Sequence, residues 1–263
     1  MKTCLSKKYK IERLKLVLSQ LGIFAFILAF WEIGARIGLL DPFFFSRPSK
    51  ILLLLINYIK SNEIFKHIYI SVLETTLGII IGSTVGIIIS TLLWASERLA
   101  KLFDPFLVIL NALPKTALAP ILIIWAGTGV TGIVVVAISI LIIVTIISTY
   151  NYFINVDPEQ IKMMQSFRAT KLQTFTKLVF PSNLVNIIGV VKINIGLAWV
   201  GVIVGEFLVS RAGIGYLIMY GGQIFRLDLV MMGVVILCFF AYIMYEIVHM
   251  IEKKLLKKRG KGI

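Results

Sequence analysis

Residues 132–153 read GIVVVAISILIIVTIISTYNYF, and this stretch of 22 residues without a charged side chain decides the fold. A membrane-spanning helix needs about 20 mostly apolar residues. Lipid offers the backbone no hydrogen-bond partner, so such a segment must satisfy its own amides as a helix. The stretch therefore predicts a transmembrane helix.

Five other long apolar stretches surround this one in the sequence. Together they predict six transmembrane helices, at residues 16–40, 70–93, 102–125, 132–153, 184–208 and 229–251. A run at 51–58, ILLLLINY, is too short to cross the bilayer and predicts a helix at the membrane surface. The expected architecture is an all-α, polytopic membrane protein. Residues 1–263 form one membrane domain, and its core spans 70–251.

The composition excludes several classes of protein. Hydrophobic residues make up 59% of the 263 residues and charged residues 15%, against about 45–50% and about 25% in soluble domains. A soluble enzyme is therefore excluded. The net charge of +14 does not indicate nucleic-acid binding, because the charges cluster between apolar runs, as in membrane proteins. Cys4 and Cys238 provide neither a disulfide framework nor a metal-ligand spacing.

The distribution of Lys and Arg predicts the topology. Apart from Lys115 and Lys192, which fall inside spans, 18 of these residues lie on the side of the N-terminus and seven on the other side. Cytoplasmic segments carry the excess of positive charge. Both the basic N-terminus, 1–15, and the basic tail, 252–263, are therefore expected in the cytoplasm, where they would contact anionic lipid.

Small residues recur at helical spacing in two of the spans. Gly78, Gly82 and Gly86 lie four residues apart and so share one helix face. Gly201 and Gly205 repeat the pattern. Such faces let another helix approach closely. They predict either static helix packing or an interface that moves.

Two prolines interrupt the third span. Pro114 and Pro120 each remove a helical hydrogen bond. Backbone groups freed at membrane depth must be covered by protein or line a wet cavity. The prolines predict either a helix that lines a pathway or a kink that serves packing.

Two lysines are expected at membrane depth. At 1.5 Å per residue, Lys115 and Lys192 lie about 20 Å and about 12 Å from the inner ends of their spans. A lysine at that depth should face protein or water and have a partner. Each lysine either attracts an anionic solute or forms an ion pair between helices. The candidate partners for such a pair are Glu206, Glu74 and Glu246. The expected translocation path comprises Asn111, Pro114, Lys115, Pro120, Lys192 and Glu206, with Glu206 at a gate.

Sequence patterns for catalysis are missing from this chain. No Gly-x-x-x-x-Gly-Lys-Ser/Thr phosphate loop occurs. His67 and His249 are isolated in the sequence, and no paired-carboxylate or metal site is visible. The chain is therefore not expected to be an enzyme or to bind a cofactor, and its energy must come from a partner or an ion gradient.

The longest inner connection, 155–181, contains the sequence VDPEQIKMMQSFRATKLQTFTKLVFP. Asp157 can cap a helix that has Pro158 at its first position. Apolar residues then recur every three to five positions, so the loop predicts two short helices with a bend near Ala169 and Thr170. Their apolar faces should be buried against another surface.

This loop resembles the motif shared by permease subunits of bacterial ABC importers, which has Glu-Ala-Ala, a Gly six residues after the Glu and a Pro thirteen residues after that Gly. Lys162, Met163 and Met164 replace Glu-Ala-Ala, Arg168 replaces the Gly that normally provides the bend, and Pro181 matches the Pro. Arg168 must therefore bend the chain by other means or alter docking.

The resemblance extends over residues 28–250. The stretches 105–129 and 197–218 are similar to the subgroup that serves sulfonates, taurine and nitrate. In the second stretch, Glu206 and residues 213–216 align with the corresponding residues of the subgroup. Lys192, just before this stretch, stands where the subgroup usually has a basic residue.

The resemblance implies a type I permease fold in the bacterial cell membrane. It also implies a pore completed by a second permease copy or a paralogue, two partner ATPase subunits that use ATP and Mg, and an extracytoplasmic solute-binding protein. The residues expected to couple to the ATPase are Met164, Phe167, Arg168, Ala169, Thr170, Leu172, Phe175 and Pro181.

The solute expected from this subgroup and from the two lysines is a small organic or inorganic anion such as sulfonate, taurine or nitrate. A vitamin precursor is the alternative, because related permeases carry such solutes. An ion-driven secondary carrier and a membrane scaffold without transport activity are the other candidate functions.

Overall fold

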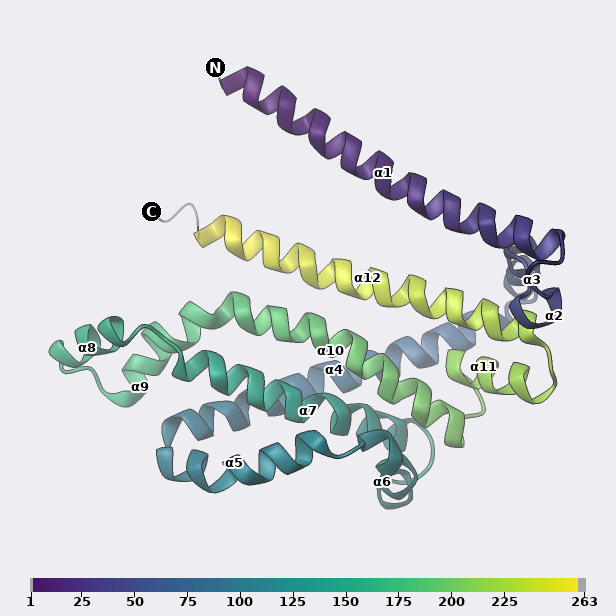
Figure 1. The fold of residues 1–263 in the computed structure, drawn as a ribbon. Helices are drawn as coiled ribbons and strands as arrows, with labels where there is room; N and C mark the ends of the chain where they lie inside the picture. Colours follow the sequence, from purple (N-terminus) through teal and green to yellow (C-terminus); the bar gives the residue numbers. More distant parts are fainter. Residues whose placement is uncertain (1, 260–263) are drawn as a thin grey trace. The chain divides into compact units, whose positions relative to one another are not determined.

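The computed structural model describes the backbone of residues 2–259, without the side chains of 2–11, 13, 14, 42, 258 and 259. Most of the basic side chains expected at the two ends, and Cys4, lie outside the described residues. Every regular element described is helical (Figure 1). The chain forms two compact units, Met1–Ile64 with Ile218–Val234 and Phe65–Leu217 with Val235–Ile263.

The expected transmembrane segments are present as helices. Five are long and apolar enough to cross a membrane: α1 (Lys2–Arg36), α4 (Glu63–Ala95), α7 (Val130–Ile154), α10 (Phe180–Val209) and α12 (Leu227–Arg259). The sixth segment is a pair, α5 (Glu97–Ala112) followed by η1 (Lys115–Leu118) and α6 (Ala119–Ala126), which passes the same test as one bent span. The expectation of six spans is confirmed with this pair counted as one.

The third expected span, 102–125, is sharply bent, and a kink is one of the two interpretations of its prolines. Its two parts meet at an angle of 85°. The break falls at Leu113, which is extended (φ −64°, ψ 135°), because the residue before a proline is disfavoured in helical conformation. Pro114 therefore ends the first helix. Pro120 lies in the first turn of α6, where a proline is tolerated and causes no kink.

The first unit ties α1 to a short helix after it. The Glu32 carboxylate accepts hydrogen bonds from the Ser49 backbone N–H (3.0 Å) and from its hydroxyl (2.9 Å). Trp31 donates to the Phe45 carbonyl in α2 (Pro42–Phe45) at 3.2 Å. Ser49 lies in α3 (Pro48–Lys60), which contains the helix expected at 51–58. The helix α11 (Ile214–Gln223) was not expected from the sequence.

The second unit is built around α7, against which the glycines of α4 pack. A Cβ atom added at Gly78 would lie 3.0 Å from the Ala137 Cβ, and one at Gly86 would lie 2.7 Å from Thr145 Cγ2. One at Gly82 would overlap Leu141. The glycine face expected on this helix is therefore a close-packing face.

The glycines of α10 pack on α7 as well. A Cβ atom at Gly201 would lie 2.5 Å from the Ala137 Cα, and one at Gly205 would lie 3.1 Å from the Ile133 Cα. Ala137 thus meets a glycine from each neighbouring helix. α7 is held between two faces that have no room for a side chain.

A buried asparagine adds a polar tie among the same three helices. The Asn194 amide on α10 donates to Ser83 Oγ on α4 (2.9 Å) and to Thr145 Oγ1 on α7 (2.8 Å). Hydrogen bonds between helices in lipid contribute about 0.6–2 kcal/mol each. They fix the register in which the glycine faces meet.

We predict that Gly201→Ala destabilises this three-helix packing. The added methyl group would meet the α7 backbone, and overpacking of this kind costs about 1–3 kcal/mol. Gly196→Ala is the matched control on the same helix, since nothing lies within 4 Å of its added Cβ. Thermal unfolding in detergent should show a lower midpoint for Gly201→Ala only. Equal midpoints for the two variants would contradict the packing account.

Candidate functional site

The 155–181 loop begins with a capped helix, as expected. The Asp157 carboxylate accepts a hydrogen bond from the Glu159 N–H (2.9 Å) at the start of α8 (Pro158–Ser166). Pro158 occupies the first turn. Backbone N–H groups there have no partner within the helix, so the missing N–H of proline removes no helical hydrogen bond.

Arg168 produces the bend through its backbone. Its φ is +52°, in the left-handed region that costs a residue with a Cβ about 1–2 kcal/mol. The Arg168 N–H donates to the Gln165 carbonyl (2.8 Å) and the Ala169 N–H donates to the Met164 carbonyl (3.1 Å). This pair of bonds is the Schellman ending of a helix, in which glycine usually takes the left-handed position. Arginine adopts here the conformation that glycine would take.

The chain then returns to the membrane-spanning part through α9 (Lys171–Thr174) and the π-helical turn η2 (Phe175–Val179), which continues into α10. Thr170 and Gln173 form a reciprocal capping box at the start of α9. The Lys171 ammonium donates to the Ala95 carbonyl at the end of α4 (2.9 Å). The loop is thus bonded to two of the three packed helices.

The apolar side chains of the loop divide into an outward and an inward set. Phe167 is 76% exposed and Leu172 is 71% exposed. Phe175 instead packs within the chain, with its ring 5.1 Å from that of Trp94 and 5.3 Å from that of Phe153. Among the other coupling residues expected from the sequence, Met164, Ala169 and Pro181 are half-buried, and Arg168 and Thr170 are exposed.

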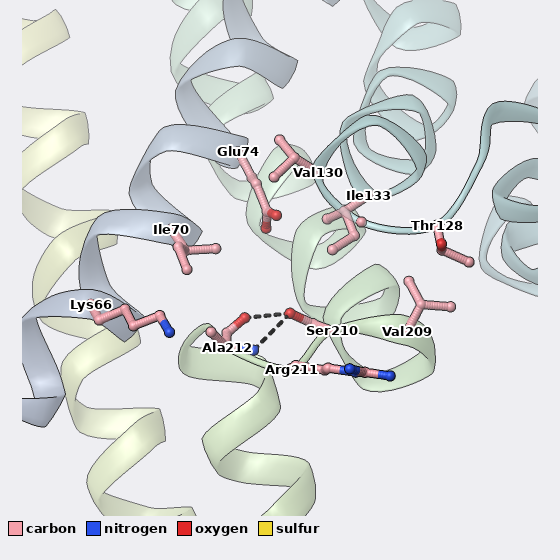
Figure 2. Close-up of a pocket in the computed structure, with 11 residues that line it drawn as sticks. Lys66, Ile70, Glu74, Thr128, Val130, Ile133, Val209, Ser210, Arg211 and Ala212 are labelled. Atoms are coloured by element: carbon pink, nitrogen blue, oxygen red, sulfur yellow. Dashed lines mark hydrogen bonds between the residues drawn. The ribbon is translucent and has the colours of Figure 1, made fainter.

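A cavity of about 580 Å³ lies at the opposite end of the three-helix packing (Figure 2). Its lining comes from the first turns of α4, the start of α7 and the segment after α10. The lining residues are Lys66, Ile70, Glu74, Thr128, Gly129, Val130, Ile133, Val209, Ser210, Arg211 and Ala212. The volume lies within the range of about 300–1,000 Å³ that is typical of small-molecule sites.

Glu206 is buried beside this cavity and holds the turn between α10 and α11. Its carboxylate accepts hydrogen bonds from Ser71 Oγ and from the Gly215 N–H, both at 2.5 Å. Gly213 has φ +132°, and a Cβ atom there would overlap Glu206. The glycines therefore let the carboxylate reach the backbone of the turn.

Glu74 lies next to Glu206, so the structure contains a carboxyl pair that the sequence analysis missed. Each residue is 1% exposed, and Glu74 lies one turn along α4 from Ser71, whose hydroxyl donates to Glu206. The residues belong to different helices, and no sequence spacing relates them. Glu74 also lines the cavity.

Lys192 forms an ion pair between helices, one of the two roles expected for it. Its partner is Glu252 on α12. The prediction of Glu206, Glu74 or Glu246 as partner was therefore wrong. The His249 Nδ1 lies 3.0 Å from the same carboxylate, so this histidine is not isolated in the fold.

The remaining residues of the expected path lie apart from the cavity. The Lys115 ammonium donates to the Asn111 carbonyl (3.2 Å) at the break between α5 and α6. Asn111, Pro114 and Pro120 are exposed at this bend. None of these residues lines the cavity, and the depth expected for Lys115 assumed a straight span. The residues expected to form one translocation path therefore lie in three separate parts of the structure: the bend between α5 and α6, the Lys192 ion pair and the turn held by Glu206.

A helical membrane protein with a short two-helix loop at one end and a polar cavity at the other is consistent with a transport subunit. Residues 78–257 match the family described as binding-protein-dependent transport system inner membrane component. The match covers more than half of the chain, and the chain belongs to this family. It is an ABC importer permease subunit.

Individual relatives agree with this assignment. The chain is 30% identical over 237 residues to a putative aliphatic sulfonates transport permease protein of Bacillus subtilis, covering 90% of this chain and 86% of the relative. It is 29% identical to a formylaminopyrimidine transport permease protein of Halalkalibacterium halodurans, covering 73% and 76%. It is 20% identical to the taurine transport system permease protein of Escherichia coli, covering 91% and 89%.

A solved structure shares the fold. The superposition on a chain of the MetNI methionine ABC transporter, solved in inward-facing conformations, has a TM-score of 0.56 at 16% identity. It covers 76% of this chain and 97% of the other. The expected ABC permease fold is confirmed.

We predict that Arg168→Gly stabilises the end of α8. Glycine removes the cost of the left-handed conformation and keeps the helix ending, a gain of up to about 1 kcal/mol. Hydrogen exchange of the 163–170 segment should slow by about fivefold for a gain of that size. Lys162→Gly, inside α8, is the control and should speed exchange because glycine weakens a helix interior. Faster exchange in Arg168→Gly would contradict the assigned conformation.

Proposed function

We propose that this permease subunit imports a small anion, handed over by an extracytoplasmic binding protein, with energy from ATP hydrolysed by two partner ATPase subunits. The observation that carries the ATPase contact is the exposure of Phe167 and Leu172 on the 155–181 loop. Exposed apolar side chains on a charged loop are typical of a protein contact. The chain has no phosphate loop of its own, so the nucleotide must bind elsewhere.

The topology follows from the charges. With both termini in the cytoplasm, the excess of Lys and Arg lies inside. The loop then faces the cytoplasm and the cavity faces outward. The cavity would receive the solute, and the loop would receive the ATPase.

The three-helix packing offers a way to connect these ends. α4 and α10 each contact α7 through glycines and share the Asn194 hydrogen bonds. Lys171 and Phe175 attach the loop to this packing. We infer that α4, α7 and α10 move as one body when ATP binding draws the loops of the pore together. A second copy or a paralogue would supply the other half of the pore.

An anionic solute is supported by two observations. The relatives named for sulfonates and taurine cover most of this chain. Lys66 and Arg211 line the cavity, and both would attract an anion. The relative named for formylaminopyrimidine keeps a vitamin precursor as the second candidate.

We predict that Phe167→Ser weakens the ATPase contact. Burying a phenylalanine side chain contributes about 1.5–3 kcal/mol, so its loss should weaken association by roughly tenfold or more. Co-purification of the ATPase subunit with tagged permease, and ATP-driven uptake in vesicles, measure the effect. Ser166→Ala is the neighbouring control and should leave both intact.

The outcome that contradicts ATPase docking at this loop is specific. If the double variant Phe167→Ser, Leu172→Ser kept co-purification and uptake at the level of the unaltered protein, docking at this loop would be contradicted. The docking site would then have to lie on another surface of the chain.

A further inference from the structure

The 155–181 loop carries only positive charge over most of its length. From residue 160 onward it contains Lys162, Arg168, Lys171 and Lys177 but no aspartate or glutamate. Lys171 donates to the carbonyl at the end of α4. The other three cations are exposed and form no ion pair within the part of the chain that the structure describes. The loop therefore presents cations that have no charged partner of their own.

Arg168 is the cation placed among the exposed apolar side chains. It occupies the turn between α8 and α9 (Figure 1), directly after Phe167 and four residues before Leu172. These two side chains are exposed by 76% and 71%. A partner surface that covers both of them must also cover the turn that joins them. The Arg168 side chain would then lose water to the contact.

The backbone of Arg168 leaves its side chain available to a partner. The left-handed conformation is unfavourable for a residue with a Cβ, and glycine would form the same helix ending. Residues held in unfavourable backbone conformations cluster at functional sites. Because the turn itself requires no side chain, the guanidinium of this exposed residue can serve a contact outside the chain.

A guanidinium that loses water needs acceptors, because a buried charge without a partner is strongly unfavourable. Its planar set of donors fits a carboxylate through two parallel hydrogen bonds. The loop differs in charge from the permease motif at two positions, with Lys162 in place of the glutamate and Arg168 in place of the glycine. Both differences are toward positive charge. The partner surface that fits this loop is therefore acidic.

We propose that Arg168 selects the ATPase partner by pairing with a carboxylate in an acidic groove of that subunit, beside the contact of Phe167 and Leu172. This inference rests on the proposed docking of the ATPase at the loop and narrows it to a partner of defined charge. Complementary charge acts on the choice of partner more than on affinity alone. An ATPase subunit with a neutral or basic groove would leave Arg168 unpaired and would bind less tightly.

The variant Arg168→Gly separates the charge from the bend, because glycine keeps the helix ending and removes only the side chain. Binding of the purified partner ATPase to the full-length permease in detergent should weaken by about tenfold, the size expected for a charge-assisted hydrogen bond. The difference from the unaltered protein should shrink as salt is added, since salt screens the pair. Lys101→Gln removes an exposed cation outside the loop, and this control should bind normally.

A cross-link identifies the carboxylate directly. Arg168→Lys supplies an amine that a carbodiimide joins to a carboxylate in direct contact, as an amide formed with loss of water. Mass spectrometry of the complex should find residue 168 joined to an aspartate or glutamate of the ATPase, and Lys101 in the same sample should give no such product. Replacing that carboxylate by lysine should then restore the binding that Arg168→Glu loses.

The outcomes separate this inference from the docking on which it rests. Equal ATPase binding by Arg168→Gly and the unaltered protein, with binding lost in Phe167→Ser, overturns the charge pairing and leaves docking at the loop standing. A loss that salt does not change overturns the pairing as well. If Arg168→Gly weakened only the adhesion to vesicles of anionic lipid, the side chain would serve the membrane and the pairing would be overturned. Unchanged binding in both Arg168→Gly and Phe167→Ser overturns docking and this inference together.

Discussion

The close approach of α7 to α4 and α10 is the constraint on which the rest of this unit depends. Lipid provides no hydrophobic drive between helices, so association relies on tight packing and hydrogen bonds. Five glycines supply the packing, and Ala137 meets one from each side. Asn194 supplies hydrogen bonds to both neighbouring helices. Sliding along this interface would separate both kinds of contact at once.

This packing connects two chemically different ends. At one end, the aromatic contacts of Phe175 and the Lys171 bond to the last carbonyl of α4 hold the 155–181 loop. At the other end, the helices frame a cavity lined by Lys66, Arg211 and the buried Glu74. If α4, α7 and α10 move as one body, as we propose, a displacement of the loop also displaces the cavity wall.

Much of this fold could be predicted because its signals are local. Long apolar stretches give the spans, glycines four residues apart give the packing faces, and Asp157 with Pro158 gives the start of the loop helix. The site was harder to predict because its residues meet only through the tertiary fold. Glu74 and Glu206 come from different helices, as do Lys192 and Glu252. The bend at Pro114 redirected a span that hydropathy alone treats as straight.

The most direct test of the central claim is a cross-link across the packed helices. Cysteines replace Ile133 on α7 and Val202 on α10, whose side chains pack in one buried cluster, in a chain whose Cys4 and Cys238 are replaced by alanine. ATP-driven uptake by the assembled transporter is measured before and after oxidation. If the three helices move as one body, the oxidised protein transports as well as the reduced protein. Loss of uptake on oxidation, with recovery on reduction, would show that the helices must slide and would contradict the account.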